Sequence, residues 1–230
     1  MGNTAPDHPV QWYTERIEYL SAFVLPERIE RLRGVLSLRT EHMTICAENT
    51  FHSQNASALV RTCEAFGLQR IYTVEELCRF RPNVNIVRGS DKWIDILHSR
   101  STAEALGKLR AEGYRIIATA PHQEGVTPAD FDIAAGPFAL LFGTEHAGLS
   151  EEATADAADG YIHIPMQGFV ESLNLSASAA IALYILTDRL RNSNIDWSIE
   201  RGRREKILFK WLMASIRDSK RILERFNSLK

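Results

Sequence analysis

Two adjoining segments decide the fold of this chain, the apolar run Phe138-Ala-Leu-Leu-Phe142 and the loop Gly143-Thr-Glu-His-Ala-Gly-Leu-Ser150. Five consecutive apolar residues are typical of a strand that is buried on both faces of a parallel sheet. The two glycines then mark a loop, and Ser150 is expected to cap a helix over Glu151–Ala158. A buried strand that leads through a polar loop into a helix predicts an α/β fold.

The flanking segments repeat this alternation of strands and helices. Further strands are expected at Met43–Ala47, Gln69–Val74, Tyr114–Thr119 and Tyr161–Ile164. Further helices are expected at Leu25–Leu38, Asn55–Phe66, Thr102–Glu112 and Leu175 to about Arg191. The stretch Glu75–Ser90 contains a proline and two asparagines and is expected to be irregular. The whole pattern predicts a single α/β sheet.

The composition of the chain is that of an ordinary globular protein. Of its 230 residues, 45% are hydrophobic and 24% are charged, which favours one main domain with small appendages. The three cysteines form no Cys-x-x-Cys pair, so we expect reduced thiols and neither a disulfide framework nor a metal centre. No apolar stretch reaches the length of a membrane span, and the N-terminus has no apolar leader. A soluble cytoplasmic protein is therefore expected.

The charges of the chain are segregated along the sequence. Between Arg115 and Arg189 there are ten acidic residues and no lysine or arginine. By contrast, the segment Trp197–Lys230 has ten basic residues and four acidic ones, although the whole chain has a net charge of −2. The ends of the chain could therefore hold a polyanion while the middle has another task. A solvated, charged helix explains the same pattern.

The glycine loop nearly reproduces the phosphate-binding pattern G-x-x-x-x-G-K-[ST]. However, Leu149 stands in place of the lysine, and Glu145 would repel phosphates, which excludes a nucleoside triphosphatase of this type. No G-x-G-x-x-G follows the first strand, which argues against a dinucleotide enzyme. The loop is either a flexible backbone segment beside a ligand or a plain turn capped by Ser150.

A second loop, Ile164 to Asn174, leads into the apolar helix near the C-terminal end of the predicted sheet. Ser172 or Asn174 can cap this helix, and capping needs only one of them. Small polar residues follow at Ser176 and Ser178, where they are poor helix formers. This surplus of polar groups indicates either a ligand or a close contact between helices.

The first predicted helix of the sheet is bracketed by Asn55 and Arg61, with apolar and small residues between them. Arg61 is expected to face the core or the upper edge of the sheet, where it needs an anionic partner such as an RNA phosphate. A structural salt bridge with Glu64 or with a carboxylate of a neighbouring loop is the alternative. In an open α/β sheet, loops after the strands converge on a ligand, so these segments are expected to meet.

Taken together, three segments resemble the three motifs of the SpoU/TrmH family of SPOUT methyltransferases. Asn55–Thr62 is similar to motif one, Leu141–Leu149 to motif two and Ile164–Ser176 to motif three, in the family's order. The resemblance spans about Pro26 to Arg191. It implies a SPOUT-type α/β knot, in which a trefoil-knotted parallel sheet is flanked by helices.

The resemblance also implies a division of the chain. Residues 1–40 would be a short helical extension, residues 41–192 the SpoU-type α/β knot methyltransferase domain, and residues 193–230 a basic C-terminal helical extension. The family forms homodimers with the cofactor near the subunit interface, so a homodimer is expected here.

The activity that the resemblance implies is methylation of a ribose 2′-hydroxyl of RNA by S-adenosylmethionine. A guanosine in the D-loop of tRNA is the expected substrate, and RNA is expected as partner rather than DNA. A ribosomal RNA 2′-O-methyltransferase of the same family and a non-catalytic RNA-binding protein on the same fold are the alternatives. A small-molecule α/β enzyme that uses another nucleotide lacks its glycine-rich fingerprint here.

The resemblance assigns roles to ten residues. The expected cofactor-binding residues are Thr119, Gly143, Ile164, Met166 and Leu173. The expected catalytic residues are Arg61, Asn55, Glu145, Ser172 and Asn174. Arg61 would be the catalytic arginine, with Asn55 as its positioning partner and the other three ordering the site or the RNA. The arginine would act either as a general base or as an electrostatic clamp on a phosphate; a guanidinium stays protonated near neutral pH, which favours the clamp.

Overall fold

The computed structural model describes residues 8–120, 125–144, 147–154 and 159–228. The chain forms two compact units. One combines Met1–Arg39 with Ser198–Lys230, and the other is Thr40–Trp197. The two ends of the chain, which the sequence presents as separate extensions, thus fold together.

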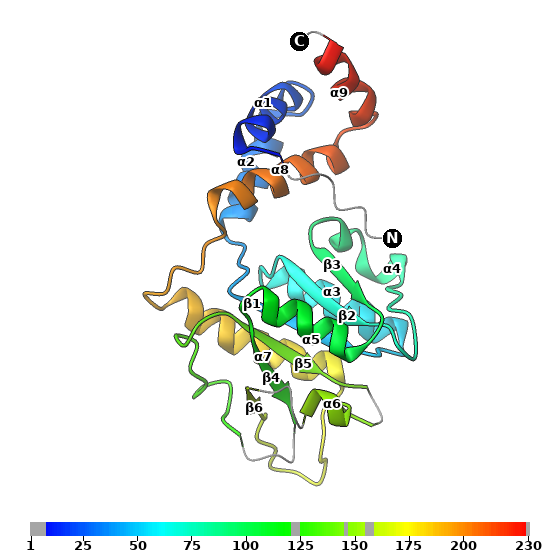
Figure 1. Cartoon of the computed structure of the whole chain (residues 1–230), viewed down its shortest axis with the longest axis vertical. Coiled ribbons are helices and arrows are strands. Elements are labelled where there is room, and N and C mark those ends of the chain that lie inside the picture. The colour runs from blue at the N-terminus through cyan, green and yellow to red at the C-terminus, as the bar shows by residue number, and fades with distance from the viewer. Residues whose placement is uncertain (1–7, 121–124, 145–146, 155–158, 229–230) are drawn as a thin grey trace. The chain divides into compact units, whose positions relative to one another are not determined.

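The Thr40–Trp197 unit is built on a six-stranded sheet in which every neighbouring pair of strands is parallel. Its strands are β1 (Met43–Glu48), β2 (Arg70–Val74), β3 (Asp95–Ser99), β4 (Arg115–Thr119), β5 (Phe138–Phe142) and β6 (Gly160–Ile162). They lie in the order β3-β2-β1-β5-β4-β6 (Figure 1). The order changes direction beside β5, and ligands of open α/β sheets bind at such a switch point, beyond the carboxyl ends of the strands.

Helices cover both faces of this sheet (Figure 1). On one face, α3 (Ser53–Ala65) and α7 (Leu175–Arg191) pack on β1 and β5 in the larger apolar core. On the other face, α5 (Thr102–Ala111) and α6 (Glu151–Thr154) close a smaller core. All five residues of β5 are buried, as the apolar run predicted. The short helices α4 (Val84–Val87) and η1 (Ser90–Lys92) lie in the segment before β3.

Most of the elements expected from the sequence are confirmed. The bounds of β5 and α7 agree with the prediction, and those of β1, β2, β4, α3 and α5 differ from it by one or two residues at one or both ends. The strand β3 is not among the predicted elements; it is an edge strand in which only Ser99 is buried. For the helix expected over Glu151–Ala158, the structure gives Glu151–Thr154, and residues 155–158 lie outside the described part.

The other unit is helical. It consists of α1 (Val10–Ser21), α2 (Pro26–Ser37), α8 (Arg201–Ser215) and α9 (Ser219–Ser228). The helix α8 contacts α1, α2 and α9, so the two ends of the chain share one core. Trp211 is buried in that core, and the guanidinium of Arg16 stacks on the Trp12 ring at 3.7 Å from its centroid. In the described part of the chain, no helix combines the length and apolarity needed to cross a membrane.

Candidate functional site

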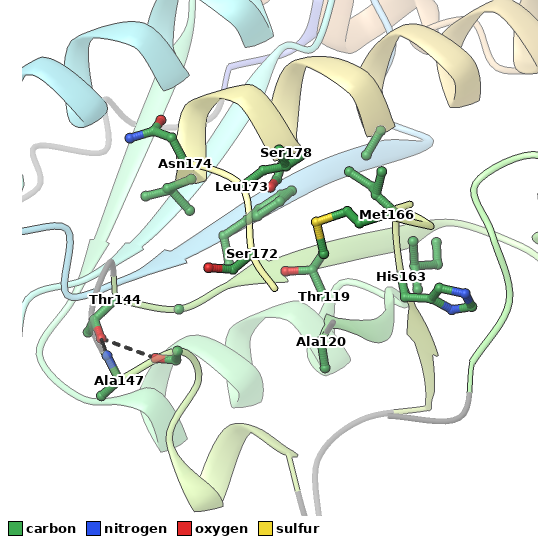
Figure 2. A pocket seen from close by; sticks show the side chains of 17 residues that line it. Thr119, Ala120, Thr144, Ala147, His163, Met166, Ser172, Leu173, Asn174 and Ser178 are labelled. Carbon is green, nitrogen blue, oxygen red and sulfur yellow. Dashed lines mark hydrogen bonds between the residues drawn. The ribbon is translucent and has the colours of Figure 1, made fainter. Parts of the chain in front are cut away.

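A cavity of about 510 Å³ lies at the carboxyl ends of β4, β5 and β6 and beside the first turns of α7. Figure 2 shows its lining, with Thr119 at the end of β4, Met166 in the loop after β6 and Ser172 in the segment before α7. Loops after three neighbouring strands thus meet at one place, as expected of an open α/β sheet. This volume is within the range of small-molecule and cofactor sites.

The structure brings all five expected cofactor-binding residues to this cavity. They are Thr119, Gly143, Ile164, Met166 and Leu173. These residues lie as far as 54 positions apart in the sequence, so only the fold could show that they share one cavity. Of the expected catalytic residues, Ser172 and Asn174 line the same cavity.

The glycine loop lines the cavity because its backbone turns back on itself. The amide of Thr144 donates to the carbonyl of Gly148 over 2.8 Å, and the amide of Gly148 donates to the carbonyl of Thr144 over 3.2 Å. A Cβ atom on Gly143 would lie 2.0 Å from the carbonyl carbon of Gly148. A side chain is therefore excluded at Gly143, and the loop presents backbone atoms to the cavity.

The described residues that line the cavity carry no formal charge, apart from the titratable His163. The hydroxyl of Thr119 donates to the carbonyl of Leu141 over 2.6 Å, which leaves its lone pairs to accept from a ligand. Uncharged walls with carbonyl and hydroxyl oxygens impose no repulsion on a cationic ligand. The uncharged lining agrees with the sequence, in which no lysine or arginine occurs between Arg115 and Arg189.

A direct hydrogen bond joins the first and third motif segments. The side-chain amide of Asn174 donates to Oδ1 of the buried Asn55 over 3.2 Å. The side-chain Oδ1 of Asn174 accepts from the amide of Ser176 over 2.9 Å, so Asn174, and not Ser172, caps α7. Asn174 therefore fixes the start of α7 and the start of α3 together, which leaves Ser172 exposed at the cavity.

Of the two positions expected for Arg61, the core and the upper edge of the sheet, the core is wrong. Arg61 lies on the exposed side of α3, and its guanidinium donates to the carbonyl of Ile86 in α4 over 2.7 Å. Helical periodicity explains this position, because Leu59, Val60 and Cys63 occupy the buried face of α3. Within the described part of a single chain, Arg61 does not line the cavity. The remaining expected residue, Glu145, lies outside the described residues.

The cavity also has lining residues that the sequence analysis did not assign to the site. His163 follows β6 directly and precedes the motif that begins at Ile164. Ser178, which the sequence analysis noted as a surplus polar residue, lies one helical turn after Asn174 and lines the cavity too. The signal for Ser178 was present in the sequence, since a polar residue on an apolar helix needs a reason.

The comparisons with known proteins agree with this fold. The model of the SpoU rRNA Methylase family matches residues 42–184, and the chain belongs to that family. A relative from Borreliella burgdorferi, a tRNA (guanosine(18)-2′-O)-methyltransferase, is 35% identical over 214 residues, which are 93% of this chain and 97% of the relative. The likeness therefore includes the terminal helices as well as the sheet.

Solved structures of SpoU/TrmH proteins have the same fold as this chain. The Aquifex aeolicus TrmH/SpoU tRNA modifying enzyme superposes with a TM-score of 0.72 at 30% identity, over 84% of this chain and 98% of the other. An rRNA methyltransferase from Sinorhizobium meliloti, solved with AdoMet bound, superposes with a TM-score of 0.57 at 28% identity, over 69% of this chain and 60% of the other. The parallel sheet flanked by helices is thus that of the SpoU/TrmH proteins.

Proposed function

We propose that this chain transfers a methyl group from S-adenosylmethionine to the ribose 2′-hydroxyl of a guanosine in tRNA. The observation that carries the proposal is the cavity that collects Thr119, Gly143, Ile164, Met166 and Leu173 from separate loops. The substrate follows from the relative from Borreliella burgdorferi, which matches this chain over nearly its full length and is named for guanosine 18 of tRNA.

The cavity suits S-adenosylmethionine, which supplies an electrophilic methyl group and has a net positive charge. Walls without lysine or arginine avoid repulsion of the sulfonium. The polar edge of the adenine needs hydrogen-bond donors and acceptors, and we propose that the backbone of the glycine loop and of the Ile164 segment, both of which line the cavity, supplies them. Gly143 is the residue on which this fit depends most, because any side chain there would displace Gly148.

The chemistry requires the ribose oxygen to lie in line behind the methyl group while negative charge develops on that oxygen. Asn55 and Asn174 hold the starts of α3 and α7 together, which orients the segments that carry Arg61 and Ser172. Ser172 is exposed at the cavity and can hydrogen-bond the incoming nucleotide. Glu145 is proposed to order the site or the RNA, as in the family motif.

Arg61 is proposed to clamp the phosphate beside the reacting ribose. Its side chain is exposed and is held by one backbone carbonyl, so four of the five N–H donors of a guanidinium can serve a phosphate. The positive charge would also stabilise the oxygen that loses its proton. Proton abstraction by an arginine would require a neutral guanidinium, and guanidinium groups in proteins keep their proton.

We further propose a homodimer with the cofactor cavity close to its interface. Apolar side chains are exposed near this cavity, in the loop before α7 and on α7 itself. They are Phe169, Val170, Leu173, Ile181 and Tyr184. Exposed apolar surface of this kind marks a protein contact, and a second chain could bring its own Arg61 to the cavity. The family's trefoil knot, a cytoplasmic location, and a division into a methyltransferase domain and terminal RNA-binding extensions complete the proposal.

The proposal is tested by two measurements on the full-length protein. Titration calorimetry with S-adenosylmethionine should give a saturable signal near one site per chain. Incubation with an unmodified tRNA transcript and labelled cofactor, followed by nuclease digestion and mass spectrometry, should give 2′-O-methylguanosine at one position. If the protein binds the cofactor and methylates ribosomal RNA but no tRNA, it is the alternative enzyme, a ribosomal RNA 2′-O-methyltransferase of the same family. Absence of both signals would leave a non-catalytic RNA-binding protein.

A further inference from the structure

The last residue of β1, Glu48, is a buried carboxylate that the motifs do not include. Only 3% of it is exposed. Its Oε2 accepts from the amide of Ser150 over 2.8 Å, and its Oε1 accepts from the hydroxyl of Ser150 over 2.7 Å. The hydroxyl of Thr102, at the start of α5, donates to Oε1 as well. Residues 54 and 102 positions away along the chain thus meet at one carboxyl group.

All three of these donors are neutral. A buried carboxylate is costly unless its oxygens are hydrogen-bonded, and hydrogen bonds to a charged group are stronger than those between neutral groups. Three such bonds therefore tie the end of β1 firmly to the residues that provide the donors. Two of the three bonds go to Ser150, the residue at which the glycine loop ends.

This tie acts on the cavity because Ser150 stands two residues after Gly148. Gly148 and Thr144 line the cavity and close the loop on each other, so the loop has one anchored end at β5 and the other at Ser150. The hydroxyl of Ser150 also accepts from the amide of Ala153, which fixes the first turn of α6. If the bonds between Glu48 and Ser150 were lost, residues 147–150 of the glycine loop would lose this anchor.

Asn49, the residue after Glu48, ties the end of β1 to the loop that follows β2. Asn49 has a φ angle of 47°, and its side-chain oxygen accepts from the amide of Leu77 in the loop after β2 over 2.8 Å. The chain then runs directly into α3, which carries Asn55 and Arg61. The end of β1 therefore has two connections. Glu48 bonds the end of the glycine loop through Ser150, and the chain itself continues from β1 to the first motif in α3.

We infer that Glu48 is a positioning residue that holds residues 147–150, the described C-terminal part of the glycine loop, in the conformation that binds S-adenosylmethionine. The inference rests on the proposed function of the cavity. If loss of the Glu48 bonds leaves only a fraction of molecules with a competent loop, the apparent Kd rises by the inverse of that fraction. The effect should therefore be seen in cofactor binding itself, before any methyl transfer.

Two substitutions at Glu48 separate hydrogen bonding from charge. In Glu48→Gln, the amide oxygen can still accept from the Ser150 amide, and the amide NH2 can donate to the two hydroxyls, which can reverse their roles. Glu48→Met has a similar length but accepts no such bond. We expect a cofactor Kd within about threefold of the wild type for Glu48→Gln and at least about tenfold higher for Glu48→Met.

A matched pair of substitutions separates positioning from general stability. Ser150→Ala and Thr102→Val each remove one hydroxyl that donates to Oε1 of Glu48. Ser150 ends the glycine loop, whereas Thr102 starts α5 and does not line the cavity. Both should lower the melting temperature, but only Ser150→Ala should raise the cofactor Kd, whereas Thr102→Val should leave it within about twofold.

The outcomes are distinguishable. Calorimetry of the wild type decides whether the cavity binds S-adenosylmethionine, and a flat titration there refutes the proposed function. If the wild type binds, equal Kd values for wild type, Glu48→Met and Ser150→Ala, in variants that melt cooperatively, overturn the positioning role alone. Equal Kd increases for Ser150→Ala and Thr102→Val would overturn it too, since they would trace the effect to general loss of stability. Should Glu48→Met not fold, the Ser150 and Thr102 pair decides the question.

Discussion

The two compact units of this chain carry opposite charges. The helical unit, Met1–Arg39 with Ser198–Lys230, contains 15 basic and 9 acidic residues, a net charge of +6. The Thr40–Trp197 unit contains 12 basic and 20 acidic residues, a net charge of −8. The net charge of −2 for the whole chain therefore hides two surfaces of different chemistry.

This difference indicates a division of labour. A cavity for a cationic cofactor requires walls without lysine or arginine, and the sheet unit provides them. RNA is a polyanion that is attracted by lysine and arginine, and the helical unit carries an excess of both. Arg61 is the exception, because it is a cation of the sheet unit that the proposed reaction needs. The following changes test whether the division is real.

Arg61→Ala should have the largest effect. Loss of the positive charge should lower methyl transfer to tRNA at least about 100-fold, while the cofactor Kd stays within about twofold. Single-turnover methylation and calorimetry measure the two quantities. Circular dichroism is the control for folding, since Arg61 also bonds Ile86. Unchanged turnover on a tRNA transcript would reject the catalytic assignment.

Gly143→Ala should be next in size. The added methyl would overlap with Gly148 and force the loop open, so we expect the cofactor Kd to rise more than about tenfold. Gly34→Ala in α2 is the matched control, because no atom lies within 4 Å of its added methyl. That variant should bind normally and melt slightly higher, because alanine favours a helix over glycine by about 1 kcal/mol. An unchanged cofactor Kd for Gly143→Ala would show that the glycine loop does not contribute to the cofactor site.

Removal of three exposed cations from α9, in the triple variant Lys220→Gln, Arg221→Gln and Arg225→Gln, should weaken RNA binding about tenfold. The cofactor Kd should not change. The dependence of RNA affinity on salt should also become shallower, by about one counterion for each phosphate contact that is lost. A matched triple of exposed cations from the sheet unit, Arg88→Gln, Lys92→Gln and Arg100→Gln, should have the smaller effect. The reverse order would contradict the division of labour.

The smallest effect concerns the thiols of the sheet unit. Burial, with a further contribution from the charge of Glu48, raises the pKa of Cys46 to about 12. The thiol is neutral when protonated, so its contribution to stability is complete below the pKa of the unfolded state and is lost as the pH rises towards 12. At pH 8, Ellman's reagent should therefore react with the partly exposed Cys78 and not with native Cys46. Labelling of Cys46 without unfolding would show that this face of the sheet is open.

Much of the fold could be predicted from the sequence because its signals are local. The apolar run of β5, the helical stripe of α7 and the polar loops between them occupy contiguous residues. The helix α1 was missed although its buried residues, Tyr13, Ile17 and Leu20, recur at helical spacing. The strand β3 gave no such signal, because an edge strand with partly exposed residues lacks a buried run.

The sequence by itself determined most elements of the sheet unit, the three motif segments and the residue types that could serve a methyl transfer. Only the tertiary structure decided that Arg61 points outward, that Asn174 rather than Ser172 caps α7, and that Glu48 bonds Ser150. The physical reason is separation along the chain: periodicity and capping act over a few residues, whereas the partners of Glu48 lie 54 and 102 positions away. Which hydrogen bonds form at that range depends on how the strands are ordered in the sheet.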